Sequence, residues 1–209
     1  MHLALASASV GRKDLLLHLK IPFTTVPSTL DEDKIWGKNP LSTLQLRAKL
    51  KGEEVVKKIA TRRYTLDAKC SLILSADSGA IIDNQLIGKP KNYKDAVRIL
   101  KTLSGKTHEF VTAIYVIIFR HLAGKKIAST SDTEVKIWQT YDTSFVTFRK
   151  LSDEDIKLYL SLTKYTKFAG GYALASAQNF ITKVQGSISN VIGLPMEKVI
   201  PIFRENKLL

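Results

Sequence analysis

The 209-residue sequence contains one cysteine, no long hydrophobic run and no histidines at metal-ligand spacing. Cys70 alone cannot form an intramolecular disulfide, which excludes a disulfide-stapled scaffold and favours a reducing compartment. The longest apolar stretch, 111–119, falls far short of the roughly 20 residues that a membrane helix needs. Residues 1–7 lack the basic start and apolar core of a signal peptide. We therefore expect a cytoplasmic protein without a membrane segment.

Several catalytic signatures are also missing. No His–Cys or His–Ser arrangement and no Gly-x-Ser-x-Gly elbow suggests covalent catalysis, and no aromatic and basic pattern for RNA is present. The segment Gly88-Lys89-Pro90 is not a Walker A loop, because Asp83 stands where a glycine is required and Pro follows the lysine. The sequence therefore does not encode a P-loop NTPase.

The composition includes 44% hydrophobic residues and a formal net charge of +13. The hydrophobic fraction is sufficient for a core, and the chain length suits one sizeable domain or two small lobes around a cleft. The positive charge favours anionic partners such as nucleotides, nucleic acid or an acidic surface. Because the lysines are spread along the chain, charge alone does not establish nucleic-acid binding.

Short strand-like and helix-like segments alternate along the whole sequence. This pattern predicts an α/β fold with a mixed central sheet flanked by helices, in a single domain covering residues 1–209. The expected strands are 3–8, 23–26, 71–75, 79–82, 110–120, 125–137, 143–148 and 179–184, and the expected helices are 12–20, 40–59, 93–103, 153–162 and a last one after residue 195.

The first candidate site segment runs from Ser7 to Lys13. A turn of small residues between a strand and a helix directs backbone N–H groups and the positive helix end toward an anion. The Ser7 and Ser9 hydroxyls and the charges of Arg12 and Lys13 would add to this attraction. An ordinary capped helix with a basic surface explains the same segment.

Asp77 and Lys89 form a second candidate pair. Asp77 follows the apolar run 72–74, so at a strand end it would ligate a divalent cation or activate a water; Asp-Ser-Gly is also a common turn. Lys89 is held between Gly88 and Pro90. A hairpin over this interval would bring the two side chains together.

Taken together, these segments resemble the Maf family of nucleoside triphosphate pyrophosphatases. The resemblance extends over nearly the whole chain, and its motifs occur in the family's order. They are Leu5-Ala6-Ser7-Ala8-Ser9 with Arg12, Asp31-Glu32, Arg47-Ala48-Lys49, Ala76-Asp77-Ser78, Gly88-Lys89-Pro90, Leu103-Ser104-Gly105 with His108 and Thr112, Ala169-Gly170-Gly171-Tyr172, and Gly186-Ser187 followed by residues 190–195.

The resemblance implies an elongated fold of two lobes around a cleft, often dimeric, similar to that of inosine triphosphatases. It implies hydrolysis of a nucleoside triphosphate to the monophosphate and pyrophosphate, assisted by Mg²⁺ or Mn²⁺. Asp77 would act as the general base or as a metal ligand, and Glu32 would lie near the metal.

The same resemblance assigns the phosphate contacts. Lys89 would act in catalysis and, with Lys49 and Arg12, would neutralise the triphosphate and the departing pyrophosphate. Ser7 and Ser9 would hold phosphate oxygens.

The sequence departs from the family at positions that select the base. These are Gly11, Ser78 and Ala175, where the family branches carry larger or more polar residues. We therefore expect a preferred base that matches neither branch, with noncanonical and modified nucleotides among the candidate substrates.

A second hypothesis is a catalytically weak regulator that binds nucleotides or nucleic acid and is linked to cell division. The charge and the altered base positions favour it. The presence of Asp77, Lys89, Lys49 and Arg12 argues against it, because a protein that has lost catalysis is expected to lose some of these residues.

Overall fold

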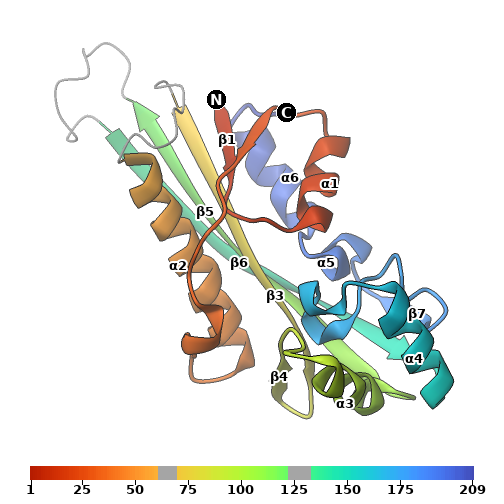
Figure 1. Cartoon of the computed structure of the whole chain (residues 1–209). Helices are drawn as coiled ribbons and strands as arrows, with labels where there is room; N and C mark the ends of the chain where they lie inside the picture. Colours follow the sequence, from red (N-terminus) through yellow and green to blue (C-terminus); the bar gives the residue numbers. More distant parts are fainter. Residues whose placement is uncertain (61–69, 122–132) are drawn as a thin grey trace.

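A seven-stranded mixed sheet organises the chain, and the computed structural model describes residues 1–60, 70–121 and 133–209. The strand order is β2-β1-β3-β5-β6-β7, with β4 paired to β3 (Figure 1). The strands are β1 (His2–Leu5), β2 (Phe23–Thr25), β3 (Cys70–Ile82), β4 (Gln85–Ile87), β5 (Thr107–His121), β6 (Thr133–Phe148) and β7 (Ile181–Gln185).

Helices cover both faces of this sheet. They are α1 (Val10–His18), α2 (Pro40–Ala60), α3 (Tyr93–Leu103), α4 (Asp153–Leu162), α5 (Ile188–Ile192) and α6 (Met196–Glu205), with 3₁₀ turns η1 (Glu32–Lys34), η3 (Tyr165–Lys167) and η4 (Ala169–Gly171). None of the helices in the described ranges is long and apolar enough to cross a membrane. The predicted α/β class, with a mixed sheet flanked by helices, is confirmed.

The two crossovers at the start of the chain lie on opposite faces of the sheet. β1 pairs in parallel with both β2 and β3. Leu16 of α1 packs with Leu72 and Leu74 of β3, whereas Leu44 of α2 packs with Ile73 on the other face. β1 and β3 therefore flank a topological switch point, where ligands of α/β sheets bind beyond the carboxyl ends of the strands.

Two core clusters share the α1 face, one at each end of the long strands. One contains α1 and α6 packed on β3 and β5, and the other contains α3 and α4 near Phe148. Figure 1 shows the same two groups of helices along the strands, with α2 on the opposite side. This arrangement agrees with the elongated, two-lobed shape expected. The single-domain assignment remains a prediction.

The sequence analysis divided two strands that are continuous. β3 runs unbroken through Asp77-Ser78-Gly79, because these residues pair with β5 from Asp77↔Ala113 to Gly79↔Val111. Asp77 therefore lies inside a strand and not at its end. Similarly, β6 joins parts of two expected strands, and 125–132 lie outside the described residues.

Gly52 lies where α2 comes closest to the sheet. A Cβ atom at this position would lie 2.8 Å from Ser75 Oγ and 3.0 Å from Tyr115 Cδ1. The missing side chain, a weak point for an isolated helix, therefore allows close packing of α2 on β3 and β5.

His108 is buried in the cluster around α3 and α4. Its Nε2 lies 2.8 Å from the hydroxyl of Tyr172, and its ring packs edge-on against Phe148. Burial lowers the pKa of His108 to about 4, so the folded protein keeps this ring neutral at physiological pH.

We expect the stability to depend on pH through His108. In the unfolded chain His108 has an ordinary pKa of about 6.5, so it binds a proton at a pH where the buried ring of the folded chain stays neutral. The free energy of unfolding therefore falls as pH drops from about 6.5 to about 4, by up to about 3 kcal/mol. Urea denaturation at several pH values should show that the free energy of unfolding depends less on pH in His108→Gln than in the exposed control His18→Gln. An equal dependence on pH in the two variants would contradict the assignment to His108.

Candidate active site

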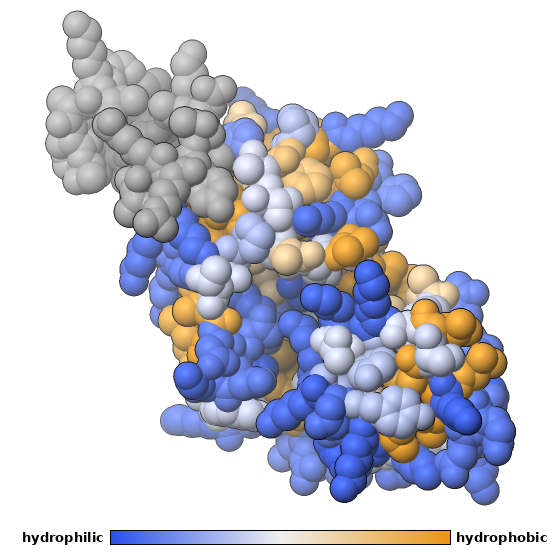
Figure 2. Space-filling model, viewed as in Figure 1, coloured by the Kyte–Doolittle hydropathy of each residue, from blue (hydrophilic) through white to orange (hydrophobic). Residues whose placement is uncertain are grey.

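The candidate site lies at a gap along one edge of β3. The last described pair with β1 is Leu5↔Leu74, and the first pair with β4 is Ala80↔Ile87. Within the described chain, residues 75–79 therefore have no strand on this side. The carboxyl end of β1 and the start of α1 meet here, as the switch point predicts. Figure 2 shows hydrophilic residues around a recess near the middle of this view.

Arg12 fills the gap from α1. Its Nε donates to the carbonyl oxygen of Gly193 at 2.7 Å. Its Nη1 donates to Ala76 O at 2.8 Å and to Ser7 Oγ at 3.1 Å, and its Nη2 donates to Ser78 Oγ at 2.8 Å. The guanidinium thus joins α1, β3 and the turn between α5 and α6.

This environment leaves Arg12 little freedom. Only 7% of the surface of Arg12 is exposed to solvent. Burial lowers the pKa of Arg12, while the charges of Asp77 and Glu32 oppose that shift; an arginine stays protonated in such surroundings. Because four of its five donor groups bond protein atoms, Arg12 fixes the frame of the site in addition to supplying charge.

Two carboxylates meet on the α2 side of β3. Lys51 of α2 places its Nζ 2.5 Å from Asp77 Oδ1 and 2.7 Å from Glu32 Oε1. Asp77 is 4% exposed. Since neighbouring side chains of a strand point to opposite faces, Asp77 faces α2 while Ser78 faces Arg12. The backbone of β3 thus separates the two halves of the site.

Arg47 approaches the second oxygen of Asp77. Its Nη1 lies 4.0 Å from Asp77 Oδ2, its Nε donates to Ile35 O, and its guanidinium stacks on the exposed ring of Trp36. Asp77 Oδ2 is buried and has no hydrogen-bond partner among the described residues. A buried carboxylate oxygen without a partner is costly unless a water, a cation or a substrate group completes it.

Lys89 completes the cluster from the loop after β4. Its Nζ lies 3.5 Å from Glu32 Oε2 and its side chain is half exposed. The loop is held by η4, where the Gly170 N–H donates to Gly88 O. A side chain at Gly171, whose φ is +73°, would meet Pro90 at 3.1 Å. Asp77 and Lys89 are thus connected through Glu32 and Lys51.

Burial opposes ionisation of Glu32, but Lys51 and Lys89 outweigh it and lower its pKa to about 2. In the unfolded chain a glutamate has a pKa of about 4.3. The folded state is therefore stabilised by the contacts of ionised Glu32 with Lys51 and Lys89 above about pH 4.3, and this stabilisation is lost as the pH falls toward about 2. We expect Glu32→Gln to lower the free energy of unfolding at pH 7 by about 2 kcal/mol and to lose less in acid than the wild type. Urea denaturation of the wild type, Glu32→Gln and the exposed control Glu154→Gln at pH 7 and pH 3 measures these free energies. If Glu32→Gln lost as much stability between pH 7 and pH 3 as the wild type, the prediction would be contradicted.

A family model described as Maf-like protein matches residues 2–206. The chain belongs to the Maf family. It is 34% identical over 210 residues to the dTTP/UTP pyrophosphatase of Aquifex aeolicus, covering 100% of this chain and 97% of that protein. It is 33% identical over 201 residues to the dTTP/UTP pyrophosphatase of Ruminiclostridium cellulolyticum, covering 95% and 92%.

Among solved structures, the Staphylococcus aureus Ham1 protein matches 70% of this Maf chain and 72% of its own, at 13% identity and a TM-score of 0.33. A similarity of this size supports no conclusion about the Maf chain. The family assignment made from the sequence motifs is confirmed by the family model and the two pyrophosphatases.

The structure brings Lys51, which the sequence analysis did not select, to the carboxylates of Asp77 and Glu32. Lys49 lies on an exposed part of α2 and pairs with Glu53 at 3.8 Å, so the structure does not bring it to the carboxylates. Arg47 was quoted only as part of a motif. The sequence did contain a signal for Lys51, because Arg47 and Lys51 are four residues apart and therefore lie on the same face of the predicted helix.

The remaining predicted residues lie on the Arg12 side of β3 or away from both halves. Ser9 caps α1, accepting the Arg12 N–H, and Ser7 accepts the Ser9 N–H at 3.2 Å. A Cβ on Gly11 would lie 2.9 Å from Ile192 Cγ2 of α5. Ala175 is exposed in the loop before β7. The structure therefore brings Ser7, Arg12 and Ser78 together.

The candidate site contains two carboxylates, those of Asp77 and Glu32. Across the described ranges there is no cluster of three or more Asp, Glu, His or Cys side chains that could hold a metal alone. Mg²⁺ commonly takes one or two carboxylates and completes its shell with waters and substrate phosphates. The partnerless Asp77 Oδ2 and the nearby Glu32 fit such a shared site.

Proposed function

We propose that this chain hydrolyses a nucleoside triphosphate to the monophosphate and pyrophosphate, as a nucleoside triphosphate diphosphatase. The observation that carries the proposal is the bridging of Glu32 and Asp77 by Lys51. Around these two carboxylates lie four cationic side chains, which leaves a net charge of +2. The cationic side chains are Arg12, Arg47, Lys51 and Lys89. Such a site attracts a polyphosphate and retains an ionised acid for proton transfer.

Asp77 is the proposed general base. Lys51 holds Oδ1, and Oδ2 is left to accept a proton from water. As the water oxygen bonds to the α-phosphorus, the bond from that phosphorus to the bridging oxygen breaks and its electron pair leaves with pyrophosphate. The proton taken by Asp77 returns to solvent after release. General-base catalysis of this kind contributes about 10²–10⁴ in rate.

The basic residues act on the charge of the phosphates. Lys89 is half exposed, so it can contact the departing pyrophosphate and stabilise the charge that develops there. We assign Ser7 and the first N–H groups of α1 to another phosphate oxygen. Arg12 holds this segment against β3 through Ala76 O. The role proposed for Lys49 in the sequence analysis passes to Lys51.

Mg²⁺ or Mn²⁺ is the proposed cofactor; Glu32 and the substrate would hold it, and binding by Asp77 is the alternative to the role of Asp77 as the base. When bound, such an ion neutralises phosphate charge and lowers the pKa of a coordinated water. Asp77 and Lys51 orient the reacting groups, and Glu32 keeps Lys51 and Lys89 near them.

Base choice is the finer part of the proposal. The names of the relatives favour a pyrimidine base, whereas Gly11, Ser78 and Ala175 favour an altered preference. Ser78 hydrogen-bonds both Arg12 and Thr112, so its hydroxyl is already engaged. We propose that the preferred substrate is a nucleoside triphosphate other than the standard pyrimidine pair, and that the enzyme acts in the cytoplasm.

The deciding experiment measures pyrophosphate release from dTTP, UTP, the other canonical triphosphates and modified triphosphates, each with Mg²⁺, Mn²⁺ or EDTA. Metal-dependent release from one group of substrates would support the proposed reaction, and the ranking would identify the base. Release from none, combined with salt-sensitive binding to random DNA, would overturn it in favour of the regulator.

A further inference from the structure

Arg47 has an unused hydrogen-bonding edge at the candidate site. Only 6% of its surface is exposed, yet within the described chain its one hydrogen bond runs from Nε to Ile35 O, at 3.1 Å. Nη1 lies 4.0 Å from Asp77 Oδ2, which is beyond hydrogen-bond distance. A guanidinium carries five N–H donors. Because polar groups in such surroundings normally have partners, the two Nη groups of Arg47 are expected to bind a ligand.

Neutralising the two carboxylates does not explain this arginine. Lys51 Nζ already lies 2.5 Å from Asp77 Oδ1 and 2.7 Å from Glu32 Oε1. Lys89 Nζ lies 3.5 Å from the second oxygen of Glu32. Asp77 Oδ2 has no hydrogen-bond partner among the described residues. Arg47 therefore places a positive charge beside the acid without occupying the oxygen that the proposed reaction uses.

The loop before α2 holds the guanidinium in this position. The central carbon of the Arg47 guanidinium lies 5.1 Å from the centre of the Trp36 ring, a cation–π contact. The ring is anchored in turn, because its Nε1 donates to Asp33 O at 2.8 Å. The N–H of Gly37 donates to Thr43 Oγ1 at 2.9 Å. Trp36 is 62% exposed and so adds little to the core; its main contact supports Arg47.

The proposed reaction brings the α-phosphorus within reach of Arg47. A water that gives its proton to Asp77 Oδ2 lies about 2.6–3.2 Å from that oxygen. In a reactive arrangement the same water lies about 3–3.5 Å from the phosphorus. Since Arg47 Nη1 is 4.0 Å from Asp77 Oδ2, a non-bridging oxygen of the α-phosphate can lie against the unused edge of the guanidinium. The planar fork of arginine matches two oxygens of a phosphate.

We propose that Arg47 contacts the α-phosphate of the substrate as a further catalytic residue, and that Trp36 is the positioning residue that holds it there. The role of Arg47 rests on the proposed hydrolysis of a nucleoside triphosphate. As the water oxygen bonds to the phosphorus and the bond to the bridging oxygen breaks, the Nη groups stabilise negative charge on the non-bridging oxygens. Lys89, which is half exposed, contacts the departing pyrophosphate.

Single-turnover pyrophosphate release from variants of both residues tests these roles. We expect Arg47→Met to lower the rate by about 10²-fold or more. Arg47→Lys keeps the charge without the fork and should lose less. Trp36→Ala should lower the rate of the wild type but not that of Arg47→Met, because the ring acts through the arginine. The matched control Arg98→Met changes an exposed arginine of α3 and should keep the wild-type rate; circular dichroism confirms that each variant is folded.

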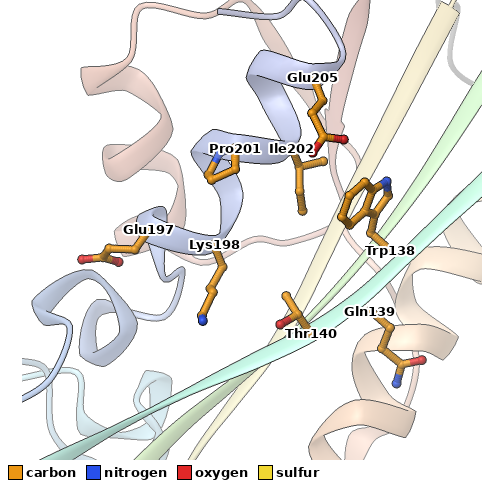
Figure 3. A pocket seen from close by; sticks show the side chains of 8 residues that line it. All are labelled: Trp138, Gln139, Thr140, Glu197, Lys198, Pro201, Ile202 and Glu205. Atoms are coloured by element: carbon orange, nitrogen blue, oxygen red, sulfur yellow. The ribbon is translucent and has the colours of Figure 1, made fainter.

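Tryptophan fluorescence separates a substrate contact from a purely structural role. The chain has two tryptophans. The other one, Trp138, points from β6 toward α6 and lines a groove of about 350 Å³ on the sheet face opposite α2 (Figure 3). In Trp138→Phe the emission therefore reports on Trp36 alone. The nucleoside monophosphate formed from the best substrate should change this emission, the nucleoside without phosphate should not, and Arg47→Met should abolish the response.

The outcomes distinguish this role of Arg47 from the reaction itself. If the wild type is active and Arg47→Met reacts as fast as Arg98→Met, Arg47 does not contact the α-phosphate and the proposed function still stands. No fluorescence change with the monophosphate would also overturn the role of Arg47. So would an equal change with the nucleoside, because Trp36 would then contact the base. A wild type that releases no pyrophosphate from any triphosphate would overturn both the role and the function.

Discussion

Asp77→Asn is expected to reduce the rate of pyrophosphate release by at least about 10³-fold. Asparagine has nearly the same shape, but its amide cannot take a proton from the attacking water. The change should cost only about 1–2 kcal/mol of stability, because Lys51 keeps its 2.7 Å contact with Glu32 and Arg47 keeps its bond to Ile35 O. Single-turnover pyrophosphate release measures the rate, and urea denaturation measures the stability.

The matched control is Asp83→Asn. Asp83 is exposed in the turn between β3 and β4, at a φ of +50° that asparagine also tolerates. This variant makes the same chemical change outside the site and should keep the wild-type rate. If Asp77→Asn retained a comparable rate, Asp77 would not be the base and the proposed reaction would lose its proton acceptor.

Arg12→Ala is expected to lower the free energy of unfolding by about 3–5 kcal/mol. The substitution removes four hydrogen bonds that join α1, β3 and the α5–α6 turn, and it leaves buried Ala76 O without this donor. Arg12→Lys keeps the charge but cannot reproduce the planar fork, so we expect an intermediate loss of about 2 kcal/mol. Urea denaturation at pH 7 gives both values.

Arg98→Ala provides the comparison for Arg12. Arg98 lies on α3, its side chain is 63% exposed and it pairs with Asp95, so its removal should cost less than about 1 kcal/mol. If Arg12→Ala unfolded at the wild-type urea concentration while activity fell, Arg12 would act on the substrate alone. Its proposed part in holding the site together would then be wrong.

Much of the Arg12 half of the site could be predicted from sequence. Ser7, Ser9 and Arg12 are close in the chain, and a strand followed by a capped helix places such residues at one end of the sheet. Short-range rules suffice there. The same short-range rules account for the caps of α3 and α4, where the side chains of Asn92 and Ser152 accept backbone N–H groups of the first helical turn.

The Asp77 half could not be predicted in the same way. Its members come from η1, α2, β3 and the loop after β4, and their meeting depends on how α2 packs on the sheet. The choice of Lys51 over Lys49 is a matter of helix rotation, which Gly52 and its close approach to Ser75 help to fix. Likewise, Asp-Ser-Gly is a frequent turn locally, and only pairing with β5 makes it strand.

The alternation of side chains along β3 has a consequence for how the family can diversify. Asp77 and Ser78 are neighbours in the chain but belong to separate packing environments, one against α2 and the other against α1 and α5. Mutations around Ser78 and Gly11 can accumulate without disturbing the acid and its lysine. A duplicated gene could thus acquire a new substrate while its hydrolytic chemistry is inherited unchanged.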